Sequence, residues 1–125
     1  MKNEIRKSSE NQKISEMVLK VAKGYIDMGE TRKERENYLR SACTAWNIAC
    51  LSPLKRESAI QQYIEQCREI NNSDPTDDKA LEEDIRLLIK QKVKLFPDVN
   101  VQIVNSKIDN IGGQDHAIVV TARIN

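Results

Sequence analysis

The sequence predicts a mainly α-helical (α+β) fold, in which a four-helix domain is closed by a C-terminal antiparallel β-hairpin. Apolar residues recur at intervals of three and four through most of residues 9–96, as on one face of an α-helix. After Pro97 they alternate with polar residues, as in a strand with one buried face. A chain of 125 residues can bury a single core without metals or disulfides. We therefore expect a disordered N-terminal arm over residues 1–9 and one domain over residues 10–125.

The centre of the domain is predicted in the stretch 41–54, which has no formal charge although 31% of the chain is charged. Its apolar residues have helical spacing, and a helix that is apolar on most sides is buried. Trp46, the only tryptophan, should fill space there. Asn47 lies among these apolar residues, where an unpaired amide costs about 1–3 kcal/mol. We expect it to bond to a neighbouring element or to line a small pocket beside Trp46.

Local signals bound the first two helices. An apolar stripe with helical spacing runs from about Ser9 to Gly29, and the glycine is placed to end that helix. Thr31 and Glu34 form the capping-box pattern, in which each side chain accepts a hydrogen bond from the other's backbone amide. We therefore expect the second helix to start after Thr31 and to run to about Leu51.

Proline marks the start of the other two helices, because it lacks the amide hydrogen that the first helical turn leaves unbonded. Ser52 precedes Pro53 as a predicted N-cap, and Asp74 precedes Pro75 in the same way. The fourth helix should end before Pro97. Acidic residues gather in its first turns and lysines in its last, an order that suits the helix dipole without any ligand.

A hairpin over residues 99–124 is predicted after the helices. Its strands should cover about 99–108 and 117–124, joined by a loop that contains Gly112 and Gly113. A two-stranded hairpin is marginally stable alone in water, so one face must pack on the helices.

The hairpin has more apolar positions than one packed face needs, because Val104 and Val119 lie on the opposite parity from the main stripe. We expect a partner protein to cover them, or a second copy that pairs the hairpins into a four-stranded sheet. Replacing Val119 with lysine should then disrupt association without unfolding the monomer. The predicted contact residues are Val101, Ile103, Val104, Ile118, Val119 and Val120.

Charge and motif content favour a binding or regulatory protein without enzymatic activity or cofactor. A net charge of +1 provides no overall field to attract nucleic acid or an anionic membrane. No uncharged run approaches the roughly 20 apolar residues of a membrane span, and no apolar signal region follows the first residues. We therefore expect a small cytoplasmic protein that contacts a protein partner or forms a homodimer.

Two alternative functions remain open. Residues 1–40 hold ten basic and seven acidic side chains, so the basic N-terminal half could serve a nucleic-acid-binding accessory protein. The basic residues alternate with glutamates, however, which favours an ion-paired surface. The three cysteines could instead form a metal or thiol-redox site, although they lack the close pairing of zinc ligands. Their odd number suits buried core positions in a reducing compartment. They are Cys43, Cys50 and Cys67.

The single histidine, His116, is the remaining candidate for chemistry. Its neighbour Asp115 could orient the imidazole as a general base. No serine or cysteine with a known nucleophile motif accompanies the pair. We therefore favour an exposed loop residue over a catalytic one.

Overall fold

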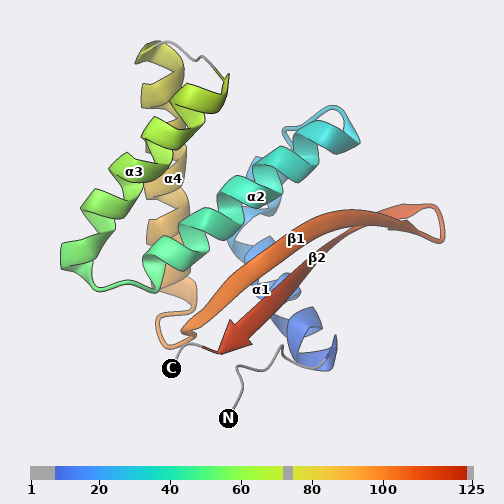
Figure 1. Cartoon of the computed structure of the whole chain (residues 1–125). Helices are drawn as coiled ribbons and strands as arrows, with labels where there is room; N and C mark the ends of the chain where they lie inside the picture. The colour runs from blue at the N-terminus through green and yellow to red at the C-terminus, as the bar shows by residue number, and fades with distance from the viewer. Residues whose placement is uncertain (1–7, 72–74, 124–125) are drawn as a thin grey trace.

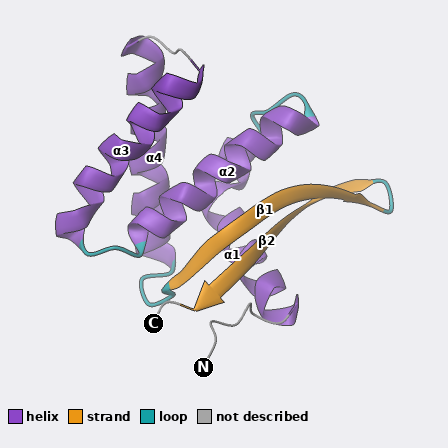
Figure 2. Cartoon of the chain, viewed as in Figure 1, coloured by secondary structure: helices purple, strands orange, loops and turns teal. Residues whose placement is uncertain are grey.

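The computed structural model describes residues 8–71 and 75–123, which form four helices and a two-stranded antiparallel sheet (Figures 1 and 2). The predicted fold class is confirmed. Every helix precedes the hairpin in the chain, as expected. The elements are α1 (Ser8–Ile26), α2 (Arg32–Ala49), α3 (Pro53–Asn71), α4 (Pro75–Leu95), β1 (Val101–Ile111) and β2 (Gln114–Arg123).

Helix α2 is the centre of the domain, because it packs against α1, α3, α4 and β1. Figure 1 shows the hairpin running across α1 and α2, with α3 and α4 beyond α2. Leu39, Ala45 and Trp46 of α2 are almost completely buried, together with Val18 of α1 and Ile85 of α4. The uncharged stretch therefore supplies the middle of the core, as its composition predicted.

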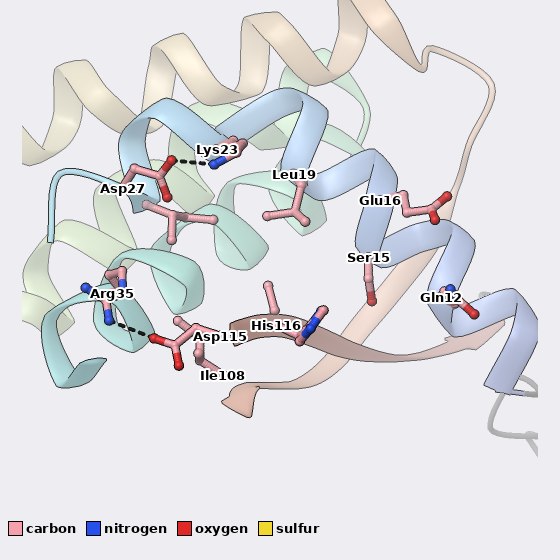
Figure 3. A pocket seen from close by; sticks show the side chains of 12 residues that line it. Gln12, Ser15, Glu16, Leu19, Lys23, Asp27, Arg35, Ile108, Asp115 and His116 are labelled. Atoms are coloured by element: carbon pink, nitrogen blue, oxygen red, sulfur yellow. Dashed lines mark hydrogen bonds and ion pairs between the residues drawn. The ribbon is translucent and has the colours of Figure 1, made fainter. Parts of the chain in front are cut away.

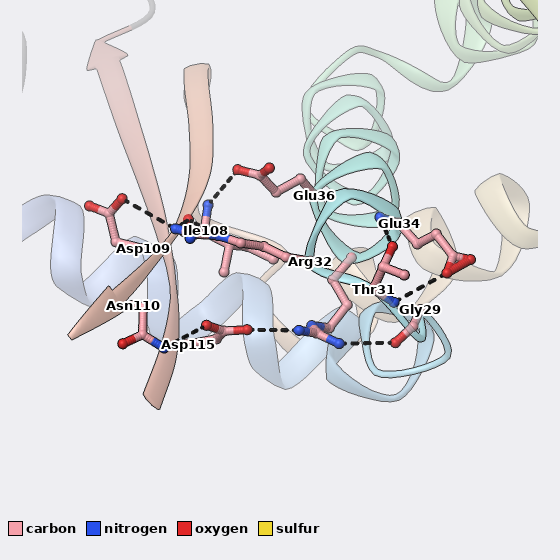
Figure 4. A network of polar contacts seen from close by, with 10 residues as sticks. Gly29, Thr31, Arg32, Glu34, Glu36, Ile108, Asp109, Asn110 and Asp115 are labelled. Atoms are coloured by element: carbon pink, nitrogen blue, oxygen red, sulfur yellow. Dashed lines mark hydrogen bonds and ion pairs between the residues drawn. The ribbon is translucent and has the colours of Figure 1, made fainter. Parts of the chain in front are cut away.

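The chain between α1 and α2 depends on a glycine and a capping box. The Glu34 amide donates to Thr31 Oγ1 at 3.1 Å, and the Thr31 amide donates to Glu34 Oε1 at 3.2 Å, as predicted (Figure 4). Helix α1 ends at Ile26, earlier than expected. Gly29 is required for close approach, since a Cβ atom there would lie 2.7 Å from the backbone nitrogen of Arg35.

Two predictions concern residues at the ends of helices. Helix α1 begins at Ser8, so residues 8 and 9 belong to the helix and not to the predicted arm. The rest of the arm lies outside the described residues. The predicted N-cap Asp74 also lies outside them, whereas Pro75 opens α4 as expected.

The strands are longer and the connection shorter than the sequence suggested. Gly112 and Gly113 alone form the turn, with φ values of +61° and +85°. Two consecutive positive φ values are the requirement of a type I′ turn, whose twist matches that of the strands. A β-bulge shifts the register between Ile103 and Asn105 and leaves Val104 as the extra residue.

The expectation that Val119 lies on an uncovered face of β2 is wrong. Val119 has 0% exposure and Thr121 is also buried, whereas Ile118 and Val120 lie on the opposite, outer face. The Thr121 hydroxyl donates to Asn11 Oδ1 of α1 at 2.8 Å, which allows a polar residue to be buried. The sequence misled because β-branched residues occupy both parities of this strand. Val119 therefore needs no cover from another molecule.

Candidate functional site: the hairpin edges and outer face

Side chains of α2 bind the free edge of β1. The Asn47 amide donates to the Ile103 carbonyl at 2.9 Å and accepts from the Ile103 amide at 2.8 Å. The Trp46 indole donates to the Val101 carbonyl at 3.0 Å. The predicted bond between Asn47 and a neighbouring element is thus confirmed, and both residues of the predicted pocket pair hold the strand edge.

The same edge is bound again nearer the hairpin tip. Glu36 Oε2 accepts from the Ile108 amide at 3.2 Å, and the Arg32 guanidinium donates to the Ile108 carbonyl (Figure 4). Unpaired strand edges promote association between chains, and inward hydrogen bonds remove that tendency. Helix α2 therefore supplies hydrogen-bond partners to the backbone of β1 on the side where another strand would otherwise pair.

Side chains of α1 bind the free edge of β2 in the same manner. The Val119 amide donates to Ser15 Oγ at 3.1 Å, and the Thr121 amide donates to Asn11 Oδ1 at 3.1 Å. Pairing two hairpins into a four-stranded sheet would have to break such bonds on at least one edge of each copy. The geometry therefore disfavours the edge-paired homodimer that the sequence suggested.

The outer face of the hairpin remains accessible. Val104 and Ile111 are each 56% exposed, and Ile118 and Val120 are half-buried. By the register of the strands, Ile118 and Val120 of β2 lie opposite the polar residues Lys107 and Asn105 of β1 on this face. Contiguous apolar patches rimmed by polar residues mark many protein contact surfaces.

Of the predicted contact residues, three are inaccessible to a partner. Val101, Ile103 and Val119 are buried against the helices within the chain. Val104, Ile118 and Val120 stay on the outer face. The structure thus divides the predicted contact set into a core half and a surface half.

Two cavities lie beside β2 and share residues on α1 and β2. The first, which we name the α1–β2 cavity, has a volume of about 320 Å³ and lies between α1, the start of α2 and the hairpin (Figure 3). The second, the outer cavity, has a volume of about 510 Å³ and adjoins the outer face. Both are lined by Gln12, Ser15, His116 and Ala117.

Ion pairs neutralise most charges of the α1–β2 cavity. Lys23 Nζ lies 2.6 Å from Asp27 Oδ2, and Arg35 Nη2 lies 2.7 Å from Asp115 Oδ2. Hydrogen bonds from Arg35 and then Asn110 lower the pKa of Asp115. Figure 4 shows the bond between Asn110 and Asp115. The printed partners of Asp115 are thus Arg35 and Asn110, and His116 is an exposed residue of β2 rather than of the expected loop.

Asn47 lines a cavity, whereas Trp46 does not. A cavity of about 290 Å³ lies at the bulge between α2 and β1, with Arg40, Cys43 and Asn47 among its lining residues. Trp46 is only 2% exposed and packs against the core. Most of the residues that line this cavity are polar.

The cysteines are unpaired, and two of them are poorly ionised. Burial raises the pKa of Cys43 to about 12 and also raises that of Cys50. Thiolates rather than thiols bind metals and attack disulfides, so burial opposes both roles. Among residues 8–71 and 75–123, no group of three or more His, Cys, Asp or Glu residues could hold a metal ion.

Sequence reasoning missed the polar residues of α1. Asn11 and Ser15 lie four residues apart, on one side of the apolar stripe that contains Ile14 and Val18. Two small polar residues repeated at this spacing along the border of a buried face are the signal that could have indicated contact with a strand edge.

The chain matches no protein-family model, no curated protein and no solved structure. Within the part of the chain that the structure describes, no helix is long and apolar enough to cross a membrane.

Proposed function

We propose that the chain is a non-enzymatic protein-binding domain whose contact surface is the outer face of the hairpin. The observation that supports this most directly is the partial exposure of Ile118, Val120 and Val104 on a face that the helices leave open. The outer cavity extends this surface to Ile111 at the hairpin tip. Burying such apolar area against a partner stabilises a complex by about 25 cal/mol per Å² before the costs of association.

The hydrogen bonds at the outer edges of β1 and β2 support a partner contact through the outer face of the hairpin rather than through strand pairing. Backbone groups of Ile103 and Ile108 on β1, and of Val119 on β2, are already bonded within the chain. A partner protein or a second copy would therefore pack side chains against the outer face. We also propose a cytoplasmic location, since three thiols without disulfides suit a reducing compartment.

The polar contacts of the basic residues favour this function over nucleic-acid binding. Arg32 binds the Ile108 carbonyl, Arg35 binds Asp115, and Lys23 binds Asp27. Phosphate contacts would have to compete with these bonds.

Site-specific photo-cross-linking tests the proposal in the protein's own host cells. A benzophenone amino acid at Ile118 should yield an adduct of discrete mass, and the same group at exposed Gln62 on α3 is the matched control. An added mass equal to the chain itself identifies a second copy, and any other discrete mass identifies a partner protein. The same adducts from both positions, or none from Ile118, would contradict the proposal.

A further inference from the structure

The bonds between α1 and β2 form a regular series that stops one step early. Asn11 accepts from the Thr121 amide and Ser15 accepts from the Val119 amide. Four residues of a helix rise about 6 Å, and two residues of a strand advance about 6.6 Å, so the two elements stay in register. The next step of the series pairs Leu19 with Ala117.

Leu19 has no polar group to offer the Ala117 amide. Alternate amides of a strand point to the same side, so the Ala117 N–H points away from β1 as the Val119 N–H does. The bonding of its cross-strand neighbour Ile108 supports this orientation, because the backbone of Ile108 bonds to α2 and not to Ala117. Among the described residues, the Ala117 amide has no hydrogen-bond partner outside the strand pair.

This open stretch of the β2 edge faces the α1–β2 cavity. Asp115 has the same parity as Ala117, and both residues line the cavity. Leu19, Ile26 and Ile108 supply apolar wall, and Figure 3 shows Leu19 pointing from α1 toward the hairpin. Two outward backbone positions beside a cavity with a partly apolar wall match the repeat of an extended peptide, whose carbonyl groups recur two residues apart.

We infer that the α1–β2 cavity binds a short extended segment of a partner protein, which adds to the β2 edge at Asp115 and Ala117. Charge favours this occupant over a small anion. Lys23 and Arg35 are bound to Asp27 and Asp115, so they present no free cation, and Glu16 adds a carboxylate to the wall. A neutral backbone with an apolar side chain suits such a lining. Ser15, already bonded to Val119, ends the site on its inner side.

The inference goes beyond the proposed function, because the β2 edge at Asp115 and Ala117 is a second protein-binding site apart from the outer face. The test uses a random linear-peptide library displayed on phage and selected against the full chain. Leu19→Asn should close the site, since an asparagine there can accept from the Ala117 amide as Asn11 does from Thr121. Lys20→Asn, at the next and exposed position, is the matched control.

Selected peptides should bind Leu19→Asn at least about tenfold more weakly than the wild type. Their affinity for Lys20→Asn should equal that for the wild type. They should also shift the nuclear magnetic resonance signal of the Ala117 amide and slow its hydrogen exchange. Ala117→Pro removes the donor itself and should weaken binding even where Leu19→Asn fails to fold.

Other results overturn the inference. Equal binding to the wild type and to Leu19→Asn removes the edge site, as does failure of the library to yield any peptide. Matching amide shifts with sodium acetate indicate a small-anion site instead. Binding that is lost in Ile118→Lys but kept in Leu19→Asn refutes the edge site and leaves the outer-face function standing. Binding that is lost in Leu19→Asn but kept in Ile118→Lys refutes the outer-face function and leaves the edge site standing.

Discussion

Asn47 on α2 and Ile103 on β1 exchange two hydrogen bonds, one in each direction, through the side-chain amide and the strand backbone. A strand neighbour would bond to Ile103 in the same way, so the asparagine takes the place of a third strand. The pair lies next to the bulge at Val104, where strand pairing is irregular. Asn47 therefore fixes the position of the hairpin on α2 and supplies the hydrogen-bond partners of the β1 edge at Ile103.

Replacing Asn47 with alanine should lower the free energy of unfolding by about 2 kcal/mol. Both backbone groups of Ile103 would lose their partner in a half-buried position, and each unsatisfied group costs about 1–3 kcal/mol when fully buried. Urea denaturation with unchanged m-value measures the effect. Asn37→Ala, which removes only an exposed bond to Arg40, serves as the control and should change stability by less than about 0.5 kcal/mol.

Two glycines give opposite expectations for the same substitution. Gly29→Ala should destabilise the fold by about 1–3 kcal/mol, because the new Cβ would lie 2.7 Å from the Arg35 backbone nitrogen. Gly24→Ala should stabilise it by about 0.5–1 kcal/mol, since Gly24 lies in α1 with nothing within 4 Å of the new atom. Thermal unfolding of the two variants measures the difference. Similar midpoints for both would show that Arg35 moves away at no cost.

Patterns local to one element could be read from the sequence, whereas those that depend on two elements could not. The capping box at Thr31 and the prolines at 53 and 75 each act within one turn, and they fixed the helix starts. The inner face of β2 depends on which side α1 approaches. Since valine or isoleucine occupies both parities at 118–120, only the contacts of Ser15 and Asn11 decide the face.

Lys92 shows the same limit on a helix. Its place near the end of α4 suits the helix dipole, as the sequence indicated for the lysines of this segment. In the structure it is buried, and its ammonium lies 5.2 Å from the centre of the Trp46 ring. Burial lowers its pKa. The sequence contains no local signal for this, because the ring comes from α2, more than forty residues earlier in the chain.

Charge at Val119 and at Ile118 should have different consequences. Val119→Lys would place an ammonium in the core without a counter-charge and should destabilise the fold by about 3–5 kcal/mol. Ile118→Lys points to the outer face and should leave the fold largely intact. Circular dichroism with urea denaturation separates the two. A folded Val119→Lys protein with altered association would restore the original sequence-based prediction and overturn the assigned faces.

Cys43 should make the fold sensitive to alkaline pH. Burial raises its pKa from 9.0 to about 12, so the folded state favours the protonated thiol. The stabilising effect is fully present below pH 9 and is lost as the pH rises from 9 toward 12. Urea denaturation across this range, compared between the wild type and Cys43→Ala, isolates the contribution from that of the tyrosines. A stability difference between the two proteins that stays constant with pH would contradict the assigned cause.

Removing the side chain that bonds the β2 edge should expose that edge. Ser15→Ala leaves the buried Val119 amide without an acceptor, which should cost about 1–3 kcal/mol and quicken hydrogen exchange at that amide. With the Ala117 position already open, the free edge would then run from Asp115 to Val119, long enough for two copies to pair. Sedimentation velocity should therefore show concentration-dependent dimers for Ser15→Ala and not for the exposed-site control Ser58→Ala. If Ser15→Ala loses stability yet stays monomeric at every concentration, the serine stabilises the packing of α1 on β2 but does not prevent strand pairing between copies.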